Sequence, residues 1–292
     1  MPARANRPAP GRPNPAAAPS GGGAGAQRQA WGPKEKPAPG RPNPAAAPSG
    51  GGAGAQCQAR GPTVWLFDLD NTLHNASAAT FSGIDSGMTD YIERELGMDR
   101  EAANALRAHY LHRYGATLLG LVRHHGVQAA HFLHDTHRLP GLEDLLHGHA
   151  HDFDALARLP GRRLVLTNAP QAYARRVLRA LGIERLFDGV ISVEQMAMFG
   201  DLRPKPDARM LRWIAAQLKV HPSRCVLVED TLMHQKAARQ VGMATVWMQR
   251  WTRRAAKHVA KAAKVGVYLH RKPPYVCARI FSLQELRKIR LP

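Results

Sequence analysis

The sequence predicts a doubly wound α/β fold, in which a parallel sheet carries helices on both faces and a helical domain is inserted after the first strand. Five short apolar runs are bounded by polar, Gly or Pro residues, as buried parallel strands are. Helical patterns lie between later runs, and such alternation is typical of doubly wound, Rossmann-like sheets. About 85 residues separate the first run from the second, which indicates an insertion.

The strands and helices follow from these patterns in chain order. Strands are predicted over residues 64–67, 163–166, 189–193, 225–228 and 244–248. Helices are predicted over residues 172–181, 208–218 and 232–241. Gly182 and Gly242 stand where two of these helices should stop. A sixth strand over 275–280 and a last helix over 282–290 complete the predicted core.

The insertion, residues 75–159, is predicted to be a helical cap over the end of the first strand. Its helices are expected over residues 86–96, 100–114, 117–125 and 129–135, with breaks at Gly115 and Gly126. In the second helix, one stripe is predicted to face the cap interior: Ala102, Ala105, Leu106, His109 and Tyr110. The catalytic core is then residues 63–74 and 160–292.

Composition excludes several classes of protein. The 292 residues contain 41 Lys and Arg against 22 Asp and Glu, a net charge of +19. No apolar run approaches the ~20 residues of a membrane-spanning helix, and the N-terminus lacks the apolar stretch of a secretory signal. Three widely spaced cysteines, Cys57, Cys225 and Cys277, exclude a disulfide scaffold. A reducing, cytoplasmic compartment is therefore expected.

The positive charge is concentrated at the two ends of the chain. Residues 1–62 hold eight Lys and Arg with one Glu, and residues 250–292 hold twelve with one Glu. Such basic segments can bind nucleic-acid backbones, or they can be solubilising appendages. The N-terminal segment has one aromatic residue for base stacking, Trp31, so we favour the appendage interpretation. Residues 250–272 are interpreted as a basic surface insertion in the core.

Residues 1–62 are predicted to be a disordered tail. Pro, Gly and Ala make up 41 of the 62 residues, and Leu, Ile, Val, Phe and Tyr are absent. Such a composition buries too little apolar surface to offset the entropy of ordering. Residues 8–33 and 37–62 are also a near-perfect tandem repeat with a 29-residue offset. A low-complexity duplication is favoured over a partner-binding tail.

The sharpest motif places Asp68 and Asp70 directly after the first predicted strand. An aspartate can attack phosphorus to give an acyl-phosphate, and a second carboxyl can protonate the leaving oxygen and then activate water. Because carboxylate and phosphoryl group are both anionic, the attack needs a cation. Mg²⁺ prefers oxygen ligands, and Asp68, the Asp70 carbonyl, Glu229 and Asp230 are the candidates.

Two further residues complete a candidate phosphoryl site. Thr167 follows the second predicted strand and can hydrogen-bond a phosphoryl oxygen, and Lys205 can balance the remaining charge. A lone Asp-x-Asp forms turns as often as sites, and Glu229-Asp230 can simply cap a helix. The order of the four motifs, three of them at strand ends, favours catalysis.

This motif set resembles the haloacid dehalogenase superfamily of phosphohydrolases over residues 63 to about 290. The resemblance implies that Asp68 in FDLDNTL is the nucleophile and Asp70 the acid and base. It places Thr167 and Lys205 in the second and third motifs, with Asn168 as a substrate contact. VLVEDT supplies Glu229 and Asp230 as the acidic fourth motif. The second aspartate of Asp-x-Asp points to phosphate chemistry rather than C–halogen cleavage.

The cap sequence is similar to that of the pyrimidine 5′-nucleotidase subgroup. The matching positions are Tyr114, Gly115, Thr117, Leu118, Gly120 and Leu121, with His137 downstream. The resemblance implies a Mg²⁺-dependent hydrolase of pyrimidine nucleoside 5′-monophosphates, with Thr117 as a substrate contact. Tyr110 and Tyr114 are predicted either to stack on the base or to pack in the cap core. Glu229 in place of Asp, and His234 where many relatives have Asn, depart from the pattern.

Several alternatives stay open. A phosphatase for another small ester, such as phosphoglycolate or a sugar phosphate, has the same motifs, and a nucleic-acid-binding protein would depend on the basic ends instead. A monomer or homodimer with no membrane partner is expected. Ten of the fifteen histidines lie in residues 109–151. His147, His149 and His151 alternate as some metal ligands do, although a solvated cap surface is favoured.

Overall fold

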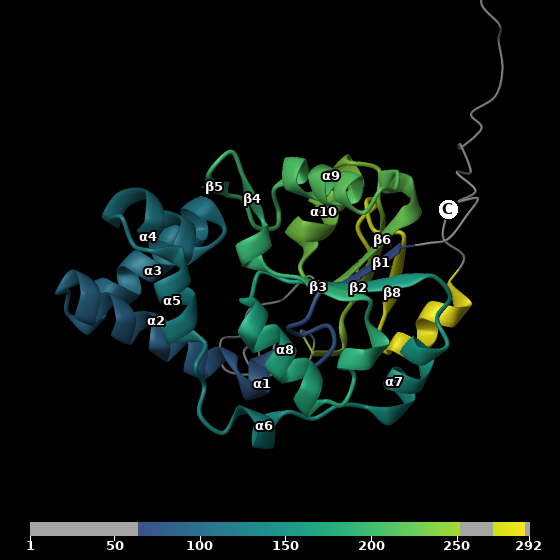
Figure 1. The fold of residues 1–292 in the computed structure, drawn as a ribbon, viewed down its shortest axis with the longest axis horizontal. Helices are drawn as coiled ribbons and strands as arrows, with labels where there is room; N and C mark the ends of the chain where they lie inside the picture. The colour runs from purple at the N-terminus through teal and green to yellow at the C-terminus, as the bar shows by residue number, and fades with distance from the viewer. Residues whose placement is uncertain (1–63, 252–270, 290–292) are drawn as a thin grey trace, which may run out of the picture. The chain divides into compact units, whose positions relative to one another are not determined.

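The structure, a computed structural model, describes residues 64–251 and 271–289 (Figure 1). Its central element is a six-stranded sheet in the order β3-β2-β1-β6-β7-β8, in which each neighbouring pair is parallel. The strands are β1 (Val64–Phe67), β2 (Arg162–Leu166), β3 (Gly189–Ile191), β6 (Cys225–Glu229), β7 (Ala244–Met248) and β8 (Ala278–Ile280). The predicted parallel sheet is confirmed.

Helices cover both faces of this sheet because side chains alternate along its strands. Trp65 and Phe67 of β1 lie in one hydrophobic cluster with α8 (Gln171–Ala180). Val64 and Leu66 lie in the other cluster. That second cluster contains the apolar sides of α9 (Ala208–Gln217) and α10 (Leu232–Gln240). Figure 1 shows α9 and α10 on the face opposite α8, which is the doubly wound arrangement.

The strand order reverses between β1 and β6. From β1 the chain continues to β2 and β3 on one side, and it then returns to β6, β7 and β8 on the other. Val64 pairs in register with Arg162 of β2 and with Cys225 of β6. In doubly wound sheets, ligands bind beyond the carboxyl ends of the strands at such a reversal. A binding site is therefore expected at the carboxyl ends of β1 and β6.

The helical insertion after β1 has its own apolar core. It contains α1 (Ala76–Ala79), α2 (Phe81–Leu96), α3 (Arg100–Tyr114), α4 (Thr117–His125) and α5 (Ala129–Thr136). Tyr91, Ile92, Leu121 and Phe132 are buried in this cluster together with Val193 of the core. The bounds of α3 and α4 are those predicted. Both helices end at glycines in the left-handed region.

The predicted inward stripe of α3 is partly wrong. Ala103 and Tyr110 are the buried residues of α3, whereas Ala102, Ala105 and His109 are exposed. Alanines lie on both the buried and the exposed faces of α3, so the pattern alone does not separate the two faces. The inner face is instead decided by contact with α2 and α4.

Three short helices were not predicted in the segment assigned to the cap: α1, α6 (Leu142–Leu145) and α7 (Ala150–Ala157). α2 also begins at Phe81 rather than at residue 86, and α7 packs against η4 (Leu283–Lys288). Leu142 and Leu156 belong to the same hydrophobic cluster as the β1 side chains. α1 and α6 have four residues each, which is about one turn and too short for a periodic apolar pattern.

The ends of the core elements differ from expectation in three places. β3 stops at Ile191 because Ser192 and Gln195 form a capping box around η2 (Val193–Gln195). β8 begins at Ala278 rather than 275, and the last helix is the 3₁₀ helix η4. The remaining elements are η1 (Glu184–Leu186), η3 (Pro222–Arg224) and a hairpin of β4 (Ala197–Met198) and β5 (Asp201–Leu202).

Some predictions concern segments outside the described residues. These are the disordered tail over 1–62, its tandem repeat with Cys57, and 252–270 of the basic insertion, together with Arg290. Among the residues that the structure does describe, no helix is both long and apolar enough to cross a membrane.

Candidate active site

The predicted catalytic residues meet at the carboxyl ends of β1, β2 and β6. Asp68 follows β1 and Thr167 follows β2, while Glu229 is the last residue of β6 and Asp230 comes next. Lys205 lies in the segment before α9. Together these residues line one cavity of about 410 Å³. Asp68, Thr167, Glu229 and Asp230 stand at the ends of strands of the central sheet, which fixes their backbone, whereas Lys205 reaches the cavity from a segment between β5 and α9.

Lys205 links two carboxylates at the bottom of this cavity. Its Nζ donates to Asp68 Oδ1 and to Glu229 Oε2, both at 2.7 Å, and to the Leu166 carbonyl at 2.8 Å. Lys205 is 1% exposed, so all three bonds are shielded from water. Three acceptors match the three hydrogens of the ammonium group. Lys205 is thus a fully satisfied buried cation.

The charges around Lys205 shift the protonation of its neighbours. Burial, reinforced by Glu229, raises the pKa of Asp68 to about 7, although Lys205 opposes the shift. Burial, together with the negative charges of Glu229 and Asp68, raises the pKa of Asp230 above its ordinary value. For Glu229, burial alone would raise the pKa, but Lys205 and His234 hold it below its usual range. Lys205 therefore stabilises the ionised form of Glu229, whereas the charges of Asp68 and Asp230 are not fully balanced.

Asp68, Glu229 and Asp230 form an acidic cluster that fits a divalent cation. One carboxylate oxygen from each lies within 4.8 Å of the others. Carboxylate oxygens are the donors that Mg²⁺ prefers. The raised pKa values of Asp68 and Asp230 indicate negative charge that Lys205 does not balance. Within the described residues, this is the single cluster of three or more potential metal ligands, so His147, His149 and His151 do not form one.

Asp70 is held by residues that no motif identified. Its Oδ1 lies 2.8 Å from the Tyr173 hydroxyl of α8 and 2.9 Å from His74 Nε2. The turn that presents Asp70 passes through Asn71, whose φ of 56° is in the left-handed region that asparagine tolerates. The Asn71 amide closes this turn with Ser77 through two hydrogen bonds. Asp70 therefore points from a fixed loop into the cavity.

Thr167 and Asn168 prepare the opposite wall. The Thr167 hydroxyl oxygen accepts a hydrogen bond from the Ala169 N–H at 3.0 Å, which leaves its hydrogen to donate elsewhere. Asn168 binds the Lys205 backbone twice, at 2.9 Å through its amide oxygen and 2.9 Å through its amide nitrogen. Asn168 thus fixes the segment that carries Lys205, a structural role in addition to the predicted substrate contact.

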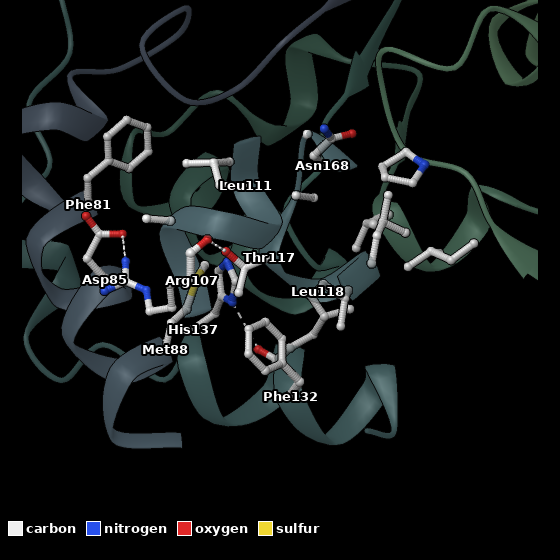
Figure 2. Close-up of a pocket in the computed structure, with 18 of the residues that line it drawn as sticks. Phe81, Asp85, Met88, Arg107, Leu111, Thr117, Leu118, Phe132, His137 and Asn168 are labelled. Carbon is white, nitrogen blue, oxygen red and sulfur yellow. Dashed lines mark hydrogen bonds and ion pairs between the residues drawn. The ribbon is translucent and has the colours of Figure 1, made fainter. Parts of the chain in front are cut away.

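A second cavity of about 580 Å³ adjoins the first (Figure 2). Six residues line both: Phe81, Asp85, Met88, Leu111, His137 and Asn168. The second cavity extends between the cap helices, and its lining includes Thr117, Leu118 and Phe132. Its main cation, Arg107, is paired with Asp85. The site thus has one compartment on the core, which contains the acidic cluster and Lys205, and an adjoining compartment under the cap, whose charged pair is Arg107 with Asp85.

The haloacid dehalogenase-like hydrolase family matches residues 63–242, more than half of the chain. This chain belongs to that family. The matched region contains the whole acidic cluster, Lys205 and the cap.

Two curated proteins are similar to part of this chain. Phosphate metabolism protein 8 of Saccharomyces cerevisiae is 30% identical over 138 residues, which are 44% of this chain and 42% of the relative. Fructose-1-phosphate phosphatase YqaB of Escherichia coli is 33% identical over 95 residues, 32% of this chain and 48% of the relative. The chain spans less than half the length of each of these curated relatives.

A solved structure shows the same fold. The HAD phosphatase from Thermococcus onnurineus superposes with a TM-score of 0.51 at 20% identity, over 77% of this chain and 96% of that one. The Rossmann-like core of the family, with its inserted helices, is therefore present here.

Two predicted substrate contacts of this family member do not reach either compartment. Tyr110 is 6% exposed in the cap core, and its hydroxyl is 2.8 Å from His125 Nε2. A Cβ on Gly120 would lie 2.1 Å from the Tyr110 ring, so glycine makes room for this packing. The Tyr114 hydroxyl is 2.6 Å from His124 Nε2 and faces a separate surface pocket. The core interpretation of Tyr110 is the one that the structure supports.

Two other residues predicted to contact substrate line the cap compartment, and some lining residues were not predicted. Thr117 and Asn168 both line the cap compartment (Figure 2). Arg107 and His137 line it as well, yet Arg107 was not singled out. Tyr173 lies on the apolar stripe of α8, so its pattern resembled that of a core residue.

Proposed function

We propose that this protein is a Mg²⁺-dependent phosphomonoesterase that hydrolyses pyrimidine nucleoside 5′-monophosphates through a phosphorylated Asp68. The observation that carries this proposal is the pairing of two compartments, one built for phosphoryl transfer and one for a leaving group of nucleoside size. Asp68 lines the first compartment, and the second compartment shares six lining residues with the first. A relative named as a phosphatase supports the same reaction class.

The acidic compartment has the groups that phosphoryl transfer needs. Asp68 is placed to attack phosphorus, while Lys205 and the Thr167 hydroxyl can balance charge on the phosphoryl oxygens. Asp70 can donate a proton to the leaving oxygen and afterwards accept one from water. Asp68, Glu229, Asp230 and the Asp70 carbonyl would hold Mg²⁺, which when bound balances the negative charge between carboxylate and phosphate.

The cap compartment favours a flat, partly apolar leaving group. Phe81 and Leu111 lie at its boundary with the acidic compartment, and both are partly exposed to the cavity space. Aromatic and aliphatic walls suit the faces of a pyrimidine ring, and Asn104 and Thr117 can hydrogen-bond its edge. Because Asp85 neutralises Arg107, the compartment does not favour a second phosphate.

A sugar phosphate is the second candidate. The Escherichia coli relative is named a fructose-1-phosphate phosphatase and matches over 95 residues. A sugar has hydroxyls around its whole ring, and the apolar walls would leave several of them without partners. The nucleotide proposal therefore has the better physical support, while the phosphoryl-transfer chemistry is the same for both.

A substrate panel tests this proposal. Phosphate release is measured for nucleoside 5′-monophosphates, sugar phosphates and phosphoglycolate, with Mg²⁺ and with EDTA. Release that requires Mg²⁺ and is concentrated on UMP or CMP supports the proposal. Faster release from fructose 1-phosphate would replace the substrate but keep the mechanism, and equal rates in EDTA would refute the role of the acidic cluster.

We also propose a reducing, cytoplasmic setting. Cys225 and Cys277, the cysteines in the described part of the chain, are both free thiols. A chain reduced on isolation, with all three thiols titrating under denaturing conditions, would support this setting.

A further inference from the structure

The side chain of Asp70 is held at one of its two oxygens. The Tyr173 hydroxyl lies 2.8 Å from Oδ1, and His74 Nε2 lies 2.9 Å from the same atom. Tyr173 is 2% exposed and His74 is fully buried, so water does not compete for these contacts. The two residues come from α8 and from the loop after β1, more than 90 positions apart.

Tyr173 is a hydrogen-bond donor to Asp70. Burial, together with the charge of Asp70, raises the pKa of Tyr173 above its ordinary value, so the hydroxyl keeps its hydrogen. A second acceptor, Thr80 Oγ1, lies 3.2 Å away. The carboxylate is closer and charged, and hydrogen bonds to charged acceptors are the stronger ones. The single hydroxyl hydrogen therefore goes to Asp70 Oδ1.

His74 is also a donor to Asp70. Its Nδ1 is buried and meets no hydrogen-bond partner among the described residues. A hydrogen on Nδ1 alone would leave a buried N–H unpaired and would set the Nε2 lone pair against Oδ1. A hydrogen on Nε2 removes both penalties. A doubly protonated ring also carries this hydrogen, so Nε2 donates to Oδ1 in either state.

Two donors fill the acceptor capacity of Oδ1, because a carboxyl oxygen has about two lone-pair sites. Asp70 lines the catalytic cavity with Asp68, and no hydrogen bond within the described residues engages Oδ2. We propose that Tyr173 and His74 are positioning residues that reserve Asp70 Oδ2 as the oxygen that carries the transferred proton. This inference rests on the proposed phosphomonoesterase function.

The proton then follows a defined route. As the bond between phosphorus and the leaving oxygen breaks, a bond forms from Asp68 to phosphorus, and the Oδ2 proton moves to the leaving oxygen. Asp70 remains as a carboxylate that Tyr173 and His74 stabilise from the Oδ1 side. Water next attacks phosphorus and gives one proton to Oδ2, and the bond from phosphorus to Asp68 breaks. Phosphate leaves, and both aspartates return to their starting states.

The replacement Tyr173→Phe tests this inference because it removes one hydrogen-bond donor and keeps the ring. Oδ1 could then hold the proton, away from the leaving oxygen. Single-turnover release is compared for two esters: p-nitrophenyl phosphate, whose phenolate leaves without a proton, and the alkyl phosphate that wild type hydrolyses fastest. Since general acid catalysis contributes about 10²- to 10⁴-fold, we expect a roughly 10- to 100-fold loss on the alkyl ester. The aryl ester should change less than about threefold.

Matched variants separate positioning from packing. Tyr91 is likewise 2% exposed, and its hydroxyl is 3.1 Å from His131 Nδ1 in the cap, away from Asp70. Tyr91→Phe should leave both rates unchanged. His74→Gln retains a donor near the Nε2 position, whereas His74→Leu has none. Gln at this position should therefore rescue much of the alkyl-ester rate that Leu loses, with KM unchanged for both.

The outcomes are distinct. A loss confined to the alkyl ester supports the inference, with thermal unfolding midpoints of Tyr173→Phe and Tyr91→Phe as the measure of packing damage. Equal losses on both esters, or no loss, would overturn the positioning role while the phosphatase function stands. A wild-type protein that hydrolyses neither ester would overturn both.

Discussion

Replacing Lys205 by methionine would remove the cation and keep a side chain of similar length. Lys205 Nζ makes 2.7 Å contacts with Asp68 and Glu229, and both carboxyls are nearly inaccessible to water. Methionine would leave two buried carboxyls without their cation. Removing one partner of a buried ion pair destabilises proteins by about 3–5 kcal/mol. We expect a loss of that size for Lys205→Met at neutral pH.

Urea unfolding followed by circular dichroism measures this loss. With a slope of about 2 kcal/mol per molar, the midpoint should fall by about 2 M. Both proteins are studied in EDTA, so that cation binding by the acidic cluster does not add to the difference. Activity should also disappear, because Lys205 balances charge at Asp68.

A second replacement distinguishes loss of charge balance from loss of packing. In Lys205→Met with Glu229→Gln, the buried carboxylate that Lys205 and His234 hold ionised becomes a neutral amide. Stability should recover by about half, while activity stays lost. Glu229→Gln alone should be less stable than wild type, because Lys205 then loses one anionic partner. A cost under about 1 kcal/mol for Lys205→Met, or a double variant no more stable than the single one, would contradict this charge-balancing role of Lys205.

Three further expectations follow from the structure. Asp68→Asn removes the proposed nucleophile, so activity should fall below about one hundredth of wild type, and a higher remaining activity would argue against a covalent intermediate. Gly120→Ala puts a Cβ against the Tyr110 ring and should destabilise the protein by about 1–3 kcal/mol, as measured by thermal unfolding. As a control, the Cβ of Gly87→Ala would lie 3.4 Å from the nearest atom, in the backbone of Thr136, and this variant should cost less. Mg²⁺ binding near pH 7 should release protons from Asp68, whose pKa is raised to about 7, seen as a buffer-dependent heat in calorimetry; buffer-independent heats would contradict the assignment.

The sequence predicted the acidic compartment well because its residues follow strands. Asp68, Thr167 and Glu229 each stand at the end of a short apolar run, and parallel strands bring such positions to one edge. Lys205 is different, since it lies in a segment without regular structure. Its place was predicted from the order of motifs and their resemblance to a family. The structure adds what that order does not contain, namely that one lysine serves two carboxylates.

Tyr110 and Tyr173 show which contacts a helical pattern does not predict. Tyr110 and Tyr173 both lie on apolar stripes of helices, and both are buried. Only the three-dimensional arrangement reveals that Tyr173 reaches Asp70 while Tyr110 packs over Gly120. The deciding contact joins positions 103 apart in the chain. A periodic pattern reports which face of a helix is buried, but not which neighbour that face meets.

The acidic cluster would connect the protonation of Asp68, the proposed nucleophile, to cation binding. A pKa of about 7 favours the protonated form of Asp68 far more than in an ordinary aspartate, and a protonated carboxyl is a poor nucleophile. The shift arises because burial and Glu229 outweigh Lys205, which already occupies Asp68 Oδ1. A divalent cation at Asp68 and Asp230 would compete with protons for the same oxygens. Cation binding and ionisation of Asp68 would then be one linked event, and the cation would prepare the proposed nucleophile as well as screen its charge from the phosphate.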